Sequence, residues 1–211
     1  MVTSISMSPS LELSPSQDQR LALAPRVVDE AVRDAARVVP NYVELRGNID
    51  ASRVTLQDAK TFAAEFKQNN PGSSVDLATV AGYATNGGRI FANAAADPDK
   101  PKHTIIHELM HGATSPKGEA WIERIGLEYK IGGANGTKDS LAEAFVERMA
   151  QIANPTNAAA YPHAGMGQLF TLLKGPNGES GFELMVRAVM NNDEAAQKSV
   201  RSQLTQLIGS P

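Results

Sequence analysis

Apolar residues recur at helical spacing along most of the chain after residue 25, and this pattern predicts a largely helical protein. In residues 25–39, for example, Val28, Val32, Ala35 and Val39 fall on one face, with charged residues opposite. The expected helices are 25–39, 55–68, 101–111, 139–153, 165–174, 181–191 and 193–208, with a helical turn at 120–127.

Strand patterns are short and are confined to the part of the chain before residue 95. Residues 41–49 and 88–93 read as strands, and 75–80 fits either a strand or a short helical segment. The pattern therefore predicts an α+β domain, mostly helical, with a small sheet that precedes the helix at 101–111. Pro101 suits the first turn of that helix and Gly112 its C-cap.

Residues 1–24 differ from the remainder, since they are rich in serine and proline and show no periodicity. We expect them to be disordered and expect one folded domain over residues 25–211. The net charge of −3 provides no basic surface for nucleic acid, and no apolar run approaches the length of a membrane span. The chain has no cysteine, so any metal site must use His, Asp or Glu.

The strongest chemical signal is the run His107-Glu108-Leu109-Met110-His111. Two histidines four residues apart on a helix leave the same face, which places two nitrogen ligands side by side for one metal ion. Glu108 can reach a water molecule at such a metal and act as its base. This pattern predicts a Zn²⁺ site in which Glu108 is catalytic.

A third ligand is needed because catalytic zinc usually has three protein ligands. An extended motif with Gly at 114 and His at 117 is excluded, since Thr114 and Lys117 stand there. The helix at 139–153 carries Glu143 and Glu147 one turn apart, flanked by small apolar residues. We assign Glu143 as the third ligand and Glu147 as the acceptor for the second ring nitrogen of His107.

Several alternatives remain at this point. Ser140 and Glu143 also fit a capping box, in which Glu143 would serve only the helix start. The third ligand would then be another carboxylate: Glu119, Glu123, Glu128 or Glu147. His103 lies one turn before the motif and is expected at the surface, whereas Trp121 is expected in the core.

His107, Glu108 and His111 with Glu143 on a later helix resemble the gluzincin metallopeptidases. The number of residues that separate His111 from Glu143 in the sequence is similar to that in the clostridial neurotoxin light chains. Small size, the N-terminal composition and the lack of cysteine resemble the zinc-metallopeptidase type III effectors of plant-pathogenic bacteria. The resemblance implies a zincin-like fold and a zinc-dependent endopeptidase. It also implies that residues 1–24 act as a secretion signal, with translocation into a host cell and cleavage of a host protein. We expect the protein to be a monomer.

In that fold the strand at 88–93 would be an edge that pairs with an extended substrate. Tyr161 and His163 are candidates for stabilising the oxyanion. Two other functions fit the same residues. The protein could bind metal and act as a host-protein binding module without proteolysis, or it could be a housekeeping intracellular metallopeptidase.

Overall fold

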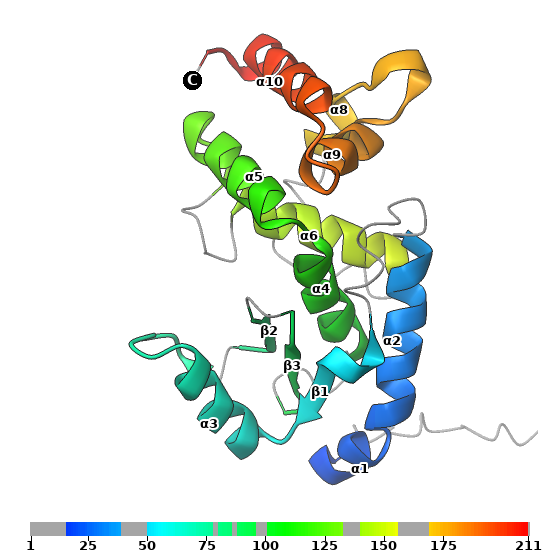
Figure 1. The fold of residues 1–211 in the computed structure, drawn as a ribbon, viewed down its shortest axis with the longest axis vertical. Helices are drawn as coiled ribbons and strands as arrows, with labels where there is room; N and C mark the ends of the chain where they lie inside the picture. Colours follow the sequence, from blue (N-terminus) through cyan, green and yellow to red (C-terminus); the bar gives the residue numbers. More distant parts are fainter. Residues whose placement is uncertain are drawn as a thin grey trace, which may run out of the picture.

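The computed structural model describes residues 16–38, 50–77, 80–85, 88–95, 101–132, 140–155 and 169–210. Within them, helices surround one small sheet (Figure 1), so the α+β class is confirmed. The helices are α1 (Gln17–Ala22), α2 (Ala24–Val38), α3 (Ala59–Asn69), α4 (Pro101–Ala113), α5 (Pro116–Glu128), α6 (Leu141–Ala153), α8 (Leu169–Leu172), α9 (Gly181–Val189) and α10 (Glu194–Ile208). The strands are β1 (Val54–Gln57), β2 (Gly82–Ala84) and β3 (Ile90–Asn93). No helix in this part of the chain is long and apolar enough to span a membrane.

The sheet has the strand order β1-β3-β2, with β1 parallel and β2 antiparallel to β3. The expectation of an edge strand at 88–93 is therefore wrong, because β3 occupies the centre and all four of its residues are buried. The edge beyond β3 is formed by β2, which the sequence pattern did not reveal. A three-residue strand that begins with Gly82 is too short to show alternation.

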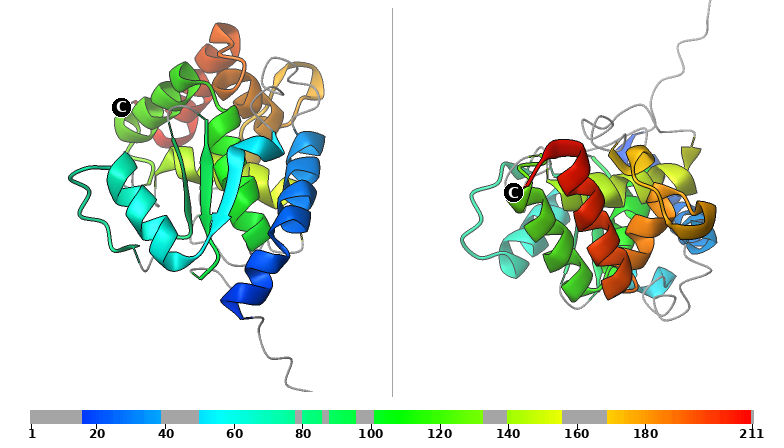
Figure 2. Two further views of the ribbon diagram at one scale, coloured as in Figure 1. Left: turned by 60° about the horizontal axis from the view of Figure 1, so that its bottom comes forward. Right: turned by 90° about the horizontal axis from the view of Figure 1, so that it is seen from above.

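Helices cover both faces of the sheet, with α3 and α4 on opposite sides (Figure 2). On the α3 side, the Tyr83 ring stacks on Phe91 at 5.1 Å between centroids and meets the edge of Phe66, also at 5.1 Å. On the α4 side, Ile90 and Ala92 join the main hydrophobic core. This alternation along β3 explains why a strand of only four residues is buried on both faces.

Helix α4 runs through the middle of the molecule, packed against α2, α6, β2 and β3. From His103 to Met110 every one of its residues is buried, and the neighbouring α2 presents Val28, Ala31 and Ala35 to the core. A helix that is buried on all sides normally carries few polar residues. The polar side chains of α4 must therefore find partners inside the protein.

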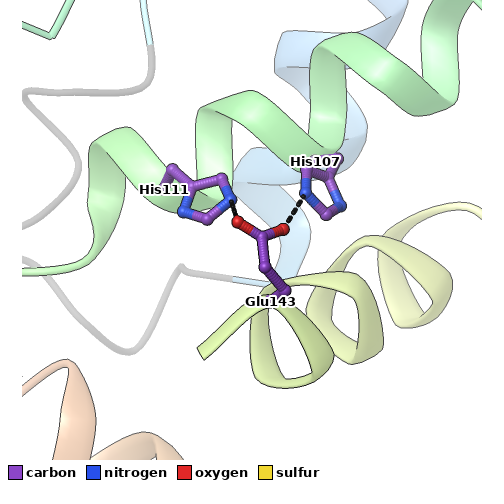
Figure 3. A group of neighbouring side chains, drawn as sticks. All are labelled: His107, His111 and Glu143. Carbon is purple, nitrogen blue, oxygen red and sulfur yellow. Dashed lines mark hydrogen bonds and ion pairs between the residues drawn. The ribbon is translucent and has the colours of Figure 1, made fainter. Parts of the chain in front are cut away.

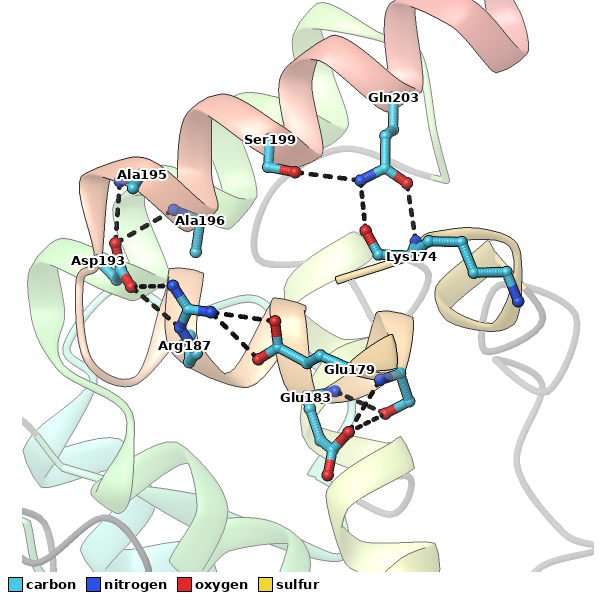
Figure 4. Close-up of polar contacts among 10 residues, drawn as sticks. Lys174, Glu179, Glu183, Arg187, Asp193, Ala195, Ala196, Ser199 and Gln203 are labelled. Atoms are coloured by element: carbon cyan, nitrogen blue, oxygen red, sulfur yellow. Dashed lines mark hydrogen bonds and ion pairs between the residues drawn. The ribbon is translucent and has the colours of Figure 1, made fainter. Parts of the chain in front are cut away.

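Helices α5, α9 and α10 pack together beyond α6 and complete the core, in which Trp121 is buried as expected. The turn between α9 and α10 is held by Arg187, which donates to both Glu179 and Asp193 (Figure 4). Asp193 also caps α10 by accepting from the backbone N–H groups of Ala195 and Ala196. The helices expected at 181–191 and 193–208 are confirmed, and the one expected at 165–174 is seen at Leu169–Leu172.

The helix expected at 55–68 begins four residues later, at Ala59, because residues 54–57 form β1. Asp58 separates the two elements, and its carboxylate accepts from the backbone N–H groups of Lys60 and Thr61. Leu56 has helical spacing relative to the apolar residues that follow, but it is buried on β1 instead. Asp58 is the N-cap of α3, and an N-cap aspartate is the sequence feature that marks where the strand ends and the helix begins.

The assignment of Gly112 as a C-cap is wrong, since α4 continues to Ala113. The next helix is set by Ser115, which caps α5, and by Pro116 at its first position. The helical conformation is sterically unfavourable for a residue that precedes a proline, as Ser115 does. The chain therefore leaves the helix at residues 114–115 rather than at Gly112. Instead of a single helical turn at 120–127, α5 is a full helix of 13 residues.

The boundary of the expected disordered segment also shifts, because residues 17–22 form α1 and α2 already begins at Ala24. A capping box between Ser16 and Gln19 starts α1, and Arg20 Nε donates to the carbonyl of Ala94 at 2.6 Å. Residues 1–15 and the strand expected at 41–49 lie outside the described residues.

Candidate metal centre

The two histidines of the motif project from neighbouring turns of α4 toward α6, with their ring centroids 5.0 Å apart (Figure 3). His107 is almost fully buried and His111 is somewhat more open. The expected helix over 101–111 is thus present, and it places both imidazoles on one face.

Glu143 reaches these histidines from the first turn of α6 (Figure 3). One carboxylate oxygen lies 3.1 Å from His107 Nε2, and the other lies 3.3 Å from His111 Nε2. The capping-box alternative is resolved by the same geometry. Ser140 Oγ accepts from the backbone N–H of Glu143, so the helix start is capped while the Glu143 side chain turns to the histidines.

The geometry of these three side chains fits a metal ion. One ligand atom from each of His107, His111 and Glu143 can be chosen so that all lie within 4.8 Å of one another. In a tetrahedral site with bonds near 2.0–2.1 Å, neighbouring ligand atoms are roughly 3.3 Å apart. The contacts of 3.1 and 3.3 Å are near this separation, but each involves a different oxygen of Glu143, so the carboxylate must adjust to offer its ligand atom to a single ion.

Without metal, hydrogen bonds between the imidazoles and the carboxylates hold the side chains of the centre together. Burial lowers the pKa of His107, but the hydrogen bonds to Glu143 and Glu147 outweigh burial and raise that pKa to about 9. Burial likewise opposes protonation of His111, yet Glu119 and Glu143 raise its pKa to about 10. Burial raises the pKa of Glu143, whereas the two histidines lower it well below its usual range. At neutral pH an anionic carboxylate thus faces two imidazolium rings, whose protons a cation can replace.

The remaining ring nitrogens also face carboxylates. His107 Nδ1 lies 3.1 Å from Glu147 Oε2, which is the contact expected from the sequence. His111 Nδ1 lies 3.7 Å from Glu119 Oε1, on α5. Glu128, another alternative ligand, instead pairs with Arg201 at 2.7 Å. Partners of this kind fix the orientation of metal-binding imidazoles.

Glu108 leaves α4 on the side of the sheet edge. The backbone N–H of Ala84, on β2, donates to its carboxylate. Burial raises the pKa of Glu108, although the nearby charges of His111 and His107 oppose that change. A carboxylate with a raised pKa beside a candidate metal centre is suited to carrying a proton.

The position of His103 in the site was not anticipated. His103 is fully buried, so the surface assignment is wrong, and its Nε2 lies 3.1 Å from both oxygens of Glu147. Its spacing of four residues from His107 was a usable signal. Tyr161 and His163 lie outside the described residues.

Comparisons of the chain with protein-family models, with curated proteins and with solved structures found no match.

Proposed function

We propose that the protein is a zinc-dependent endopeptidase of the gluzincin type with a zincin-like fold. The observation that carries this proposal is the meeting of His107, His111 and Glu143 from two packed helices, with Glu108 on the turn between the histidines. Two nitrogens and one carboxylate oxygen are a donor set that suits zinc, and three protein ligands leave a position open for chemistry.

A zinc ion held by these three residues would supply a Lewis acid, which polarises a peptide carbonyl and lowers the pKa of water. The chain's own residues provide the remaining steps. Glu108 takes a proton from the water that attacks the carbonyl and passes it to the departing amine. Its raised pKa favours the first transfer, because the carboxylate must become a carboxylic acid transiently. Glu147 keeps the His107 ring in place during the reaction.

The edge strand β2 supports the assignment of a peptide substrate. The carbonyl of Ala81 accepts from Asn93 of β3, Thr85 donates to the carbonyl of Arg89 just before β3, and Tyr83 pairs with Phe91, so alternate residues of this segment face β3. Gly82 and Ala84 therefore present their backbone groups on the opposite side, where the described part of the chain places no further strand. The Ala84 N–H already donates to Glu108, so the edge offers a peptide the Gly82 groups and the Ala84 carbonyl. An extended peptide that pairs with this edge would lie beside Glu108.

The substitution Glu108→Gln tests the proposal, because it removes the proton carrier and leaves all three proposed ligands. Zinc-loaded wild-type protein and the variant would each be incubated with a peptide library, and internal cleavage would be detected by mass spectrometry. We expect the wild type to cleave and the variant to bind zinc normally but to be slower by about 10²–10⁴-fold. A wild-type protein that binds zinc but cleaves nothing, and whose biological effect survives Glu108→Gln, would instead be a binding module.

We also propose that the peptidase acts on a host protein after type III secretion. The support is the Ser/Pro-rich composition of residues 1–24. Fusing residues 1–50 to a reporter and measuring secretion through the needle apparatus tests this part separately. A reporter that stays in the bacterium would favour a housekeeping peptidase.

A further inference from the structure

His103 occupies the buried end of the contact between α4 and α6, one turn before His107. It has no exposed surface, and its Nε2 lies 3.1 Å from each oxygen of Glu147. A buried imidazole that faces a buried carboxylate from 3.1 Å is a specific contact rather than chance packing, since unpartnered polar groups are costly in the core.

Glu147 is the point where this contact joins the metal centre. Its side chain is almost fully buried, and three groups surround its carboxylate. His103 meets both oxygens, His107 Nδ1 lies 3.1 Å from Oε2, and Gln151 Nε2 donates to Oε1 at 2.9 Å. The carboxylate is therefore held from both helices, by α4 through the histidines and by α6 through Gln151.

The direction of these hydrogen bonds follows from the charge of Glu147. Its two oxygens face nitrogen atoms of His103, His107 and Gln151, and these surroundings suit an ionised carboxylate. An ionised carboxylate only accepts. His103 Nε2 and His107 Nδ1 therefore both carry protons and donate. With its proton on Nδ1, His107 can offer the Nε2 lone pair to a cation.

We propose that His103 is a positioning residue for the metal centre: it fixes the Glu147 carboxylate, which in turn sets the tautomer and orientation of His107. This assignment rests on the proposed zinc site. Without the His103 donor, the carboxylate keeps, among the described residues, the contacts with Gln151 and His107 and can turn about its terminal bond. The His107 ring then loses a fixed partner, and zinc binds to a less ordered ligand.

A merely structural role for His103 makes a different prediction. If its ring only fills space and satisfies Glu147, removing it weakens the whole fold and leaves the zinc affinity of the folded protein unchanged. Zinc affinity and fold stability therefore have to be measured separately on the same variants.

The experiment compares the full-length wild type with His103→Leu, which has no donor, and His103→Gln, whose amide can still donate to Glu147. Zinc dissociation constants would be measured by competition with a chromogenic chelator, and the stability of each metal-free protein by urea unfolding. We expect His103→Leu to bind zinc about 10–100-fold more weakly, the range typical for loss of such partners, and His103→Gln to stay within a few-fold of wild type.

A double-mutant cycle with Glu147→Gln adds a second test. If His103 acts through Glu147, then His103→Leu should weaken zinc binding little further once Glu147 has been replaced. Additive effects in the cycle, or an unchanged zinc affinity in folded His103→Leu, would overturn the assignment.

A measurement on the wild-type protein covers the case in which His103→Leu does not fold. In ¹⁵N-labelled, zinc-loaded protein, NMR should show His103 protonated at Nε2 and His107 protonated at Nδ1. A His103 ring without a proton at Nε2 would refute the proposal. A wild-type protein that fails to bind zinc would overturn the proposed function together with this inference, whereas the other negative outcomes leave the proposed function intact.

Discussion

The substitution Glu143→Ala provides the sharpest test of the proposed metal centre, because Glu143 is the one of the three proposed ligands that comes from α6. A zinc ion bound to His107, His111 and Glu143 would link α4 to α6. Because this site exists only in the folded protein, zinc binding would stabilise the folded state relative to the unfolded state. At free zinc 100-fold above the dissociation constant, this stabilisation is about 2.7 kcal/mol. In a chain of this length, that corresponds to a rise in Tm of about 5–11 °C.

Loss of a residue that only hydrogen-bonds to a metal ligand weakens metal binding by up to roughly 100-fold. Removing a direct ligand should weaken zinc binding by more than this. At the same free zinc concentration, a 100-fold weaker site stabilises by about 0.4 kcal/mol, which is a rise in Tm of only about 1–2 °C. Each variant must be compared with and without zinc. Glu143→Ala also removes the hydrogen bonds that hold the histidines in the metal-free protein.

The assay is thermal unfolding followed by circular dichroism, in chelator and in a zinc buffer of fixed free concentration. Glu123→Ala is the matched control. Glu123 is a carboxylate on α5 whose pKa is raised by burial and by the neighbouring charges of Glu119 and Glu143, but it is outside the ligand group. It should retain the full zinc-dependent rise. A full rise in Glu143→Ala, or its loss in Glu123→Ala, would refute the ligand assignment.

Two further predictions concern glycines that lie against other elements. A Cβ at Gly82 would come within 3.0 Å of Glu108 Cγ, so Gly82→Ala should displace the base and lower kcat roughly tenfold, since ~1 Å can cost ~10²-fold. Peptidase kinetics with unchanged zinc affinity would support this, and Gly112→Ala, whose nearest neighbour is 3.9 Å away, should behave as wild type. A Cβ at Gly118 would come 1.7 Å from the carbonyl oxygen of Val189, so Gly118→Ala should destabilise the protein by at least about 1–3 kcal/mol in urea unfolding. An unchanged unfolding midpoint would show that α5 and α9 separate more easily than their packing suggests.

The parts of the site that sequence reasoning found are those set by local geometry. His107 and His111 share a face because a helix repeats every 3.6 residues, whatever surrounds it. Glu143 and Glu147 were found by the same argument on a second helix. That the two faces would meet was inferred from the chemistry, because burying carboxylates beside small apolar residues requires a partner.

The parts it missed depend on tertiary packing. The burial of His103 results from α6 and α2 covering α4, and no single-helix pattern shows which side will be covered. The position of β3 at the centre of the sheet depends on the later pairing of β2, whose three residues show no alternation. In 55–68 the local pattern misled, because Leu56 has helical spacing but belongs to a strand.

On both helices that build the site, the polar side chains recur every four residues. The two rows of side chains alternate along the contact between the helices, and they run in opposite sequence directions. On α4 the row is His103, His107 and His111, and on α6 it includes Glu147 and Glu143. Glu147 lies between the first two histidines, and Glu143 lies between the last two. The inner end of this row is sealed, whereas at the outer end 16% of the His111 side chain and 26% of the Glu143 side chain remain exposed. Among the described residues, the outer end is the one open to solvent, and it is the end at which we propose that zinc binds and a peptide approaches.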